Sequence, residues 1–163
     1  MQSALILHNI RSVHNVGSIF RTADGAGVSK IILTGYSPSP LDQHGQPRKD
    51  FAKVSLGAEK MVPWTQLKTI GAAIKQLKKE GFTIIAIELD KKSVDIFKYK
   101  PKKGEKLGLI LGNEVDGVSK PTLKQCDVIV EIPMRGKKES LNVSVAAGVA
   151  MFTLLHRGQS SVK

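Results

Sequence analysis

Three short stretches of this chain carry polar side chains of the types that bind substrates and assist group transfer. In chain order they read HNVGSIFRTADGAGV, LGNEVDGV and IPMRGKKESLN. Their polar candidates are Asn15, Arg21, Glu114, Ser140 and Asn142. An arginine can bind phosphate or stabilise a developing negative charge, a carboxylate can bind an amine, a hydroxyl or a cationic side chain, and asparagine amides can orient reacting groups. Whether these side chains form one site depends on the elements that carry them.

Each stretch also has a simpler structural explanation. The apolar residues spaced from Val16 to Ala23 mark one face of a helix, and Arg21 points away from that face as a solvated charge would. The glycine-rich second stretch fits a strand-to-helix turn, and it matches neither a P-loop nor the GxGxxG dinucleotide motif. In the third stretch, Ser140 or Asn142 can cap the helix that follows.

The third stretch also places apolar side chains inside a loop rich in glycine and lysine. Its apolar members are Ile132, Met134 and Leu141. Ligand pockets are mostly apolar with a few placed polar groups. These side chains therefore fit the walls of a pocket for a flat, uncharged ring such as adenine.

The elements around these stretches alternate between strands and helices. Apolar runs predict strands at 3–7, 30–34, 83–88, 107–111 and 127–132. Helical spacing predicts a helix that begins near Ser12 to Asn15, a short helix near Ser119 and a helix over 142–156. It also predicts a helix over 64–80, with Leu67, Ile70, Ile74 and Leu77 on one face and Gly81 as its stop. A long loop, 35–50, has no periodicity. The alternation predicts an α/β fold with a mostly parallel sheet and helices on both faces, in which ligands bind beyond the carboxyl ends of the strands.

Composition limits the class of protein. A chain of 163 residues suffices for one domain with a real core, and its formal charge of +11 and pI of about 9.8 favour a polyanionic partner such as nucleic acid. We expect a cytoplasmic protein without membrane contact. Cys126 is the single cysteine, no secretory signal is recognised, and no apolar run approaches about 20 residues. The four histidines lack metal-ligand spacing, and no GxSxG hydrolase motif occurs, so we expect no metal.

Taken together, the three stretches resemble the three motifs of the SpoU/TrmH family of SPOUT-class RNA ribose 2′-O-methyltransferases. The resemblance rests on HNVGSIFRTADGAGV, LILGNEVDGV and IPMRGKKESLNVSVAAGVAMF, in this order and at this spacing, and covers about residues 5–157. It implies an α/β sheet with a deep C-terminal trefoil knot, a homodimer with the active site at the subunit interface, and S-adenosylmethionine as the cofactor. Many members of the family carry an extra RNA-binding domain or terminal helices; in a departure from them, we expect residues 1–163 to form a single catalytic domain with no separate RNA-recognition domain.

The resemblance assigns roles to individual residues. The positions that match its cofactor contacts, with their neighbours, are Gly112, Ile132, Leu141, Leu111, Met134 and Glu88. The catalytic set that it implies is Arg21, Asn15, Glu114, Ser140 and Asn142. Arg21 would either accept the proton of the ribose hydroxyl or stabilise the developing alkoxide. A guanidinium is a poor base, which favours the second role.

The RNA would be a tRNA or an rRNA, bound by the domain's own surface. Candidate phosphate contacts are the basic segment 91–106, Arg48, Lys49, Arg135, Lys137 and Lys138. Two other readings compete with an RNA methyltransferase. A non-catalytic RNA-binding protein on the same scaffold would not need the intact polar set. An enzyme acting on a small nucleotide would not need the charge of +11.

Overall fold

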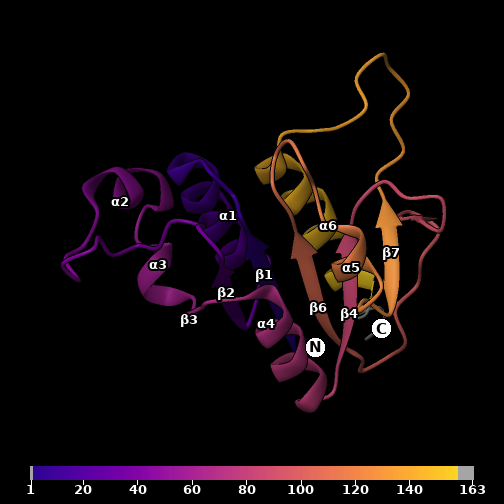
Figure 1. Cartoon of the computed structure of the whole chain (residues 1–163), viewed down its shortest axis with the longest axis horizontal. Helices are drawn as coiled ribbons and strands as arrows, with labels where there is room; N and C mark the ends of the chain where they lie inside the picture. Colours follow the sequence, from indigo (N-terminus) through magenta and orange to yellow (C-terminus); the bar gives the residue numbers. More distant parts are fainter. Residues whose placement is uncertain (1, 158–163) are drawn as a thin grey trace, which may run out of the picture.

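A seven-stranded, all-parallel sheet forms the centre of the molecule (Figure 1). The computed structural model describes residues 2–157. The strands are β1 (Ser3–His8), β2 (Lys30–Thr34), β3 (Trp64–Leu67), β4 (Phe82–Ile87), β5 (Val94–Asp95), β6 (Lys106–Leu111) and β7 (Val128–Glu131). They lie in the order β3-β2-β1-β6-β4-β7-β5, and every pairing is parallel. The carboxyl ends of the strands therefore meet along one edge.

Helices cover both faces of this sheet, as predicted. They are α1 (Val13–Gly25), α2 (Lys49–Ser55), α3 (Ala58–Met61), α4 (Ile70–Lys79), α5 (Lys120–Leu123) and α6 (Val143–Arg157). Alternate strand residues face opposite layers. Leu5 and Leu7 of β1 join α1, α2, α3 and α6 in one buried cluster, whereas Ala4 and Ile6 join α4 and α5 in the other.

The predicted strands are confirmed to within one residue at each end, because their apolar runs are buried on both faces of the sheet. The predicted start of the first helix is also confirmed. The Ser12 hydroxyl accepts a hydrogen bond from the backbone amide of Asn15 at 3.2 Å and caps α1. The short α5 begins directly after Ser119 and carries a proline in its first turn, as expected, although the Ser119 side chain makes no capping hydrogen bond.

The prediction of one helix over 64–80 is wrong. Residues Trp64–Leu67 form the edge strand β3, and α4 begins only after Thr69, whose hydroxyl accepts from the amide of Ala72. Leu67 and Ile70 pack against the same buried cluster, so their helical spacing arises from two different elements. The sequence also does not predict β5, α2 or α3.

The segment between β7 and α6 rises far above the sheet before the chain returns, as the orange-to-yellow loop in Figure 1 shows. After this loop, α6 packs against α1 and β6 rather than beside β7. The end of the third predicted stretch therefore lies beside α1, which contains the first stretch.

We expect the replacement of Phe51 by alanine to lower the free energy of unfolding by about 3–5 kcal/mol, because it leaves a cavity between α1 and α2. Phe51 is fully buried, and its ring meets that of Phe20 edge-on with 5.2 Å between the centroids. Chemical denaturation measures the change. Met61→Ala, at a side chain 71% exposed, serves as the control. A loss for Phe51→Ala as small as that of the control would contradict this account of the core.

Candidate active site

A cavity of about 820 Å³ opens at the carboxyl edge of the sheet. The loops that follow β4, β6 and β7 line it, together with the start of α6. Its size lies in the range usual for cofactor and ligand sites. The predicted site residues in its lining are Glu88, Leu111, Gly112, Glu114, Ile132, Met134, Ser140 and Leu141. All the predicted cofactor residues are in this set, but Asn15, Arg21 and Asn142 are not.

Two glycines allow the loop after β6 to fold back on itself. A Cβ atom at Gly112 would lie 2.5 Å from the backbone carbonyl carbon and oxygen of Gly117. Gly117 has a φ of +63°, and a Cβ there would lie 2.3 Å from a carboxylate oxygen of Glu88. Close approach of the Gly117 backbone therefore requires glycine at 112, and the positive φ together with the Glu88 carboxylate requires glycine at 117.

Glu88 holds the far end of this loop. One of its carboxylate oxygens accepts a hydrogen bond from the backbone amide of Val118 at 2.7 Å, and the other accepts from the amide of Leu89 at 2.9 Å. The carboxylate thereby joins the end of β4 to the loop after β6, where both line the cavity.

Asn113 organises the same loop from within and is only 8% exposed. Its Oδ1 accepts from the backbone amides of Val115 and Asp116, both at 2.8 Å. Its Nδ2 donates to the backbone carbonyl of Asn9 at 2.9 Å and to the Tyr36 hydroxyl at 2.8 Å. One buried amide therefore ties the cavity loop to the ends of β1 and β2.

Neither Asn113 nor Tyr36 is among the site residues predicted from the sequence. The available signal was the asparagine between Gly112 and Glu114, a residue type that readily hydrogen-bonds backbone amides two and three residues ahead. No pattern in the sequence points to Tyr36, which lies 77 residues away from Asn113 along the chain.

Glu114 connects the second predicted stretch to the first. Its carboxylate accepts hydrogen bonds from the backbone amide of Arg11 at 3.1 Å, that of Ser12 at 3.5 Å, and the Asn15 side chain at 3.2 Å. These donors lie at the start of α1, where free amides favour a negative charge. Partial burial raises the pKa of Glu114. Hydrogen bonds from the amides of Arg11 and Glu114 itself, the Asn15 side chain and the Ser12 amide outweigh it and bring the pKa below the ordinary value of 4.5.

Asn142 brings the third stretch to the same place. Its side-chain amide donates to Oδ1 of Asn15 at 3.2 Å, and its own Oδ1 accepts from the backbone amide of Ser144 at 2.9 Å at the start of α6. The capping role expected for Ser140 or Asn142 thus falls to Asn142. Ser140 is exposed on the cavity wall. The row Glu114, Asn15 and Asn142 joins all three predicted stretches.

Arg21 lies outside this row. It is exposed on α1, as its helical position predicts, and makes no hydrogen bond or ion pair with any residue in 2–157. Asn15, of the same predicted catalytic set, contacts Glu114 and Asn142 and makes no side-chain hydrogen bond to Arg21 within residues 2–157. A single protomer therefore presents the cavity and Arg21 at separate places.

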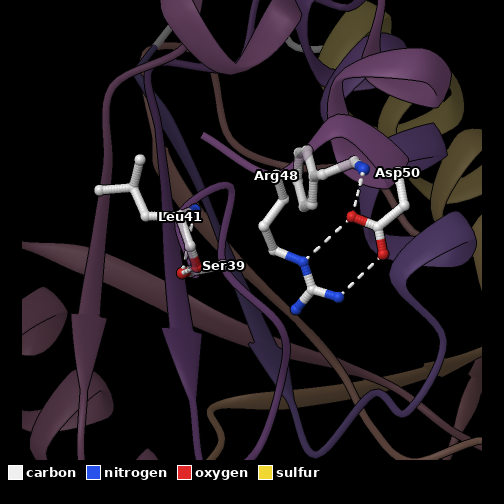
Figure 2. A network of polar contacts seen from close by, with 5 residues as sticks. Ser39, Leu41, Arg48 and Asp50 are labelled. Atoms are coloured by element: carbon white, nitrogen blue, oxygen red, sulfur yellow. Dashed lines mark hydrogen bonds and ion pairs between the residues drawn. The ribbon is translucent and has the colours of Figure 1, made fainter. Parts of the chain in front are cut away.

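The predicted phosphate contacts differ in availability. Arg48 forms a two-pronged ion pair with Asp50, with nitrogen–oxygen distances of 3.1 and 2.9 Å, so its charge is already neutralised (Figure 2). Backbone contacts between Leu41 and Pro47 and between Arg48 and Pro40 close the segment that precedes this pair, and the Ser39 hydroxyl bonds the backbone of Leu41 within it (Figure 2). The other basic candidates are Lys49, Arg135, Lys137, Lys138 and the lysines of 91–106; Lys137 and Lys138 line the cavity itself.

Carboxylates are concentrated around the cavity despite the chain's net charge of +11. They are Glu88, Glu114, Asp116, Glu131 and Glu139. Apolar walls come from Ile132, Met134 and Leu141 on the opposite loop. The combination suits a ligand with an apolar ring and a positive charge. In the described part of the chain, no group of three or more His, Cys, Asp or Glu side chains is placed to hold a metal ion, and no helix has both the length and the apolar character to cross a membrane.

Comparison with known proteins gives consistent results. The sequence model of the SpoU rRNA Methylase family matches residues 2–152. An uncharacterized tRNA/rRNA methyltransferase of Archaeoglobus fulgidus is 36% identical over 92% of this chain and 62% of its own length. The 23S rRNA (guanosine-2'-O-)-methyltransferase RlmB of Neisseria meningitidis serogroup B is 35% identical over 90% of this chain and 55% of its own. An AdoMet-bound rRNA methyltransferase from Sinorhizobium meliloti superposes with a TM-score of 0.86 at 27% identity, over 98% of this chain and 57% of that one.

We expect Glu114→Gln to lower the free energy of unfolding by at most about 1 kcal/mol near neutral pH, since the carboxylate is partly exposed to solvent. The difference should hold above pH 4.5, the ordinary value, and disappear as the pH falls through the lowered pKa of the folded state, because the wild-type carboxyl is then protonated. Denaturation of both proteins from pH 7 to pH 3 measures it. Asp116→Asn is the matched control, because Asp116 makes no side-chain hydrogen bond within residues 2–157. A pH-independent difference would contradict the role of the charge.

Proposed function

The chain belongs to the SpoU rRNA methylase family, and we propose that it transfers the methyl group of S-adenosylmethionine to a ribose 2′-hydroxyl of RNA. The observation that carries the proposal is the convergence of all three motif stretches on one cavity edge, through Glu114, Asn15 and Asn142. The chain spans 62% and 55% of the length of the two curated relatives, so activity, substrate and partners are proposed from its own site.

The cavity residues fit the proposed cofactor. S-adenosylmethionine carries an adenine ring, which Ile132, Met134 and Leu141 would enclose, and a sulfonium, which the surrounding carboxylates favour electrostatically. When bound, it supplies an electrophilic methyl group. Glu88 and Gly112 shape the floor of the cavity by fixing the loop after β6.

Arg21 would act on the substrate rather than on the cofactor. A guanidinium keeps its proton, so it would stabilise the negative charge that develops on the ribose oxygen and hold the neighbouring phosphate. Asn15 and Asn142 would orient the groups at the cavity edge, where Glu114 fixes Asn15.

We further propose a homodimer in which Arg21 of one subunit completes the cavity of the other. The separation of Arg21 from the cavity within one protomer supports this arrangement. Exposed apolar side chains on α6, Val145 (51%) and Phe152 (47%), offer surface for a subunit contact.

The C-terminal segment would form the deep trefoil knot that the resemblance implies. The return of the chain from β7 to pack α6 against α1 and β6 supports this proposal. The net charge of +11 supports an RNA substrate, either tRNA or rRNA, in the cytoplasm.

The direct test incubates the purified protein with methyl-labelled S-adenosylmethionine and total RNA, then fractionates the RNA and maps label by the nuclease resistance of 2′-O-methylated linkages. Label in one RNA species supports the proposal and identifies the substrate. RNA binding without cofactor binding or label would instead favour a non-catalytic RNA-binding protein.

We expect Arg21→Ala to lower methyl transfer at least about a hundredfold, because a charge-stabilising donor is lost. Cofactor affinity, measured by calorimetry, should stay within about twofold because Arg21 would contact the substrate rather than the cofactor. Lys75→Ala, at an exposed cation on the opposite helical layer, controls for loss of charge. Retention of most activity by Arg21→Ala would rule out the assigned role.

Mixing two inactive variants tests the shared site. We expect Gly112→Val to lose cofactor binding, because its Cβ collides with Gly117. Co-expressed with Arg21→Ala, it should restore about a quarter of wild-type activity, since half of randomly paired dimers contain one complete site of two. No recovery in a mixture shown to contain heterodimers would mean that Arg21 does not serve the partner's cavity.

A further inference from the structure

Tyr36 is a surface aromatic residue that is held at two points. Its side chain is 57% exposed, two residues beyond the end of β2. Its hydroxyl accepts a hydrogen bond from Nδ2 of Asn113 at 2.8 Å, and its backbone amide donates to Oδ1 of Asn9 at 3.3 Å. An exposed tyrosine usually samples several rotamers, whereas these contacts hold one orientation.

The turn that presents Tyr36 has a specialised backbone. Asn9 and Gly35 both have positive φ, +54° and +64°. A Cβ atom at Gly35 would lie 1.8 Å from Oδ1 of Asn9, so only glycine permits the Asn9 side chain to reach the Tyr36 amide. Sequence-distant loops are thereby locked around an aromatic ring that contributes little to the core.

The ring lies beside the candidate active site. Asn113, its hydroxyl partner, lines the cavity and precedes Glu114, which binds the start of α1. Arg11, whose backbone amide Glu114 also binds, is exposed on the same edge of the sheet and carries a positive charge. Tyr36 is thus an exposed aromatic ring bonded to the cavity loop, and the same loop binds the segment that carries the Arg11 charge.

This combination suits a nucleic-acid base. Proteins hold unpaired RNA bases by stacking them on aromatic side chains, while nearby cations bind the phosphates. Three of the chain's eight aromatic residues, Phe20, Phe51 and Phe82, are buried and cannot do this. Within the loops at the cavity edge, Tyr36 is the large exposed aromatic residue that bonds directly to the cavity lining.

We propose that Tyr36 is a stacking platform for a base of the RNA substrate close to the nucleotide that reacts, and that Asn113 is the residue that positions it. The proposal rests on the proposed function in one respect, that the substrate is RNA. Purines present more ring surface than pyrimidines, so the platform favours a purine at this place.

The test measures binding of fluorescently labelled oligo(A) and oligo(U) of equal length to the full-length protein by anisotropy, over a series of salt concentrations. We expect Tyr36→Ala to weaken binding of oligo(A) on the order of tenfold, and oligo(U) less, because one stacked base is lost. The slope of log affinity against log salt should not change, since no charge is removed. Tyr36→Phe keeps the ring and should retain the preference for oligo(A). Met61→Ala, remote on α3, should match the wild type.

Two readouts separate stacking from a structural role. Thermal unfolding and the affinity for S-adenosylmethionine, by calorimetry, should change little in Tyr36→Ala, because Asn113 keeps its bonds to Asn9, Val115 and Asp116. Equal losses for both oligonucleotides, or a parallel fall in cofactor affinity, would overturn the platform. Wild-type binding of oligo(A) that Tyr36→Ala leaves unchanged would overturn it as well. If the wild type methylates RNA and Tyr36→Ala is equally active, this inference alone is overturned. If the wild type binds no RNA, the proposed function is overturned too.

Discussion

The hydrogen bonds that converge on the loop after β6 hold the candidate site together. In an all-parallel sheet each strand delivers its following loop to the same edge, but nothing in the sheet fixes those loops against one another. Here Asn113 and Glu114 do so, with one buried amide and one carboxylate that reach the ends of β1 and β2 and the start of α1. These bonds join segments about a hundred residues apart in sequence, in addition to the pairing of β1 with β6.

The same bonds divide the site into two parts with different mechanical character. Close packing fixes the loop at the cavity floor, because the backbones of Gly112 and Gly117 leave no space for a Cβ atom and Glu88 bonds the amide of Val118 at the loop end. The polar row at the rim is exposed and rests on single hydrogen bonds near 3.2 Å. A rigid floor suits a cofactor that is held in one pose, and a lightly bonded rim suits a substrate that must enter and leave.

The sequence was most informative where burial alone decides the structure. Unbroken apolar runs predicted five strands, because a parallel strand that is covered by helices on both faces must be apolar at nearly every position. It misled at 64–80, where Leu67 and Ile70 share a buried cluster but belong to different elements. The short helices α2 and α3 lie in a region without periodicity, and packing against α1 stabilises them rather than their own propensity.

For the site, motif resemblance selected residues that do line the cavity, but it could not say which of them touch. The separation of Arg21 from the cavity depends on where α1 packs, and the Arg48–Asp50 ion pair depends on the side-chain rotamers of both residues. Residue types alone predict neither. Asn113 was not predicted because its role is structural. Its side chain binds backbone groups inside a turn, and its residue type alone does not distinguish this role from that of an ordinary loop asparagine.

The central place of β1 has a consequence for how the chain folds as it is made. β1 is synthesised about a hundred residues before one of its two neighbours, β6, which pairs Leu107 with Ser3 and Leu111 with Leu7. At synthesis rates of about 5–20 residues per second, the middle of the sheet stays open for roughly 5–20 s after β1 emerges. During this time an apolar strand edge is exposed to other chains, so this topology demands either late collapse or protection of the nascent β1 strand.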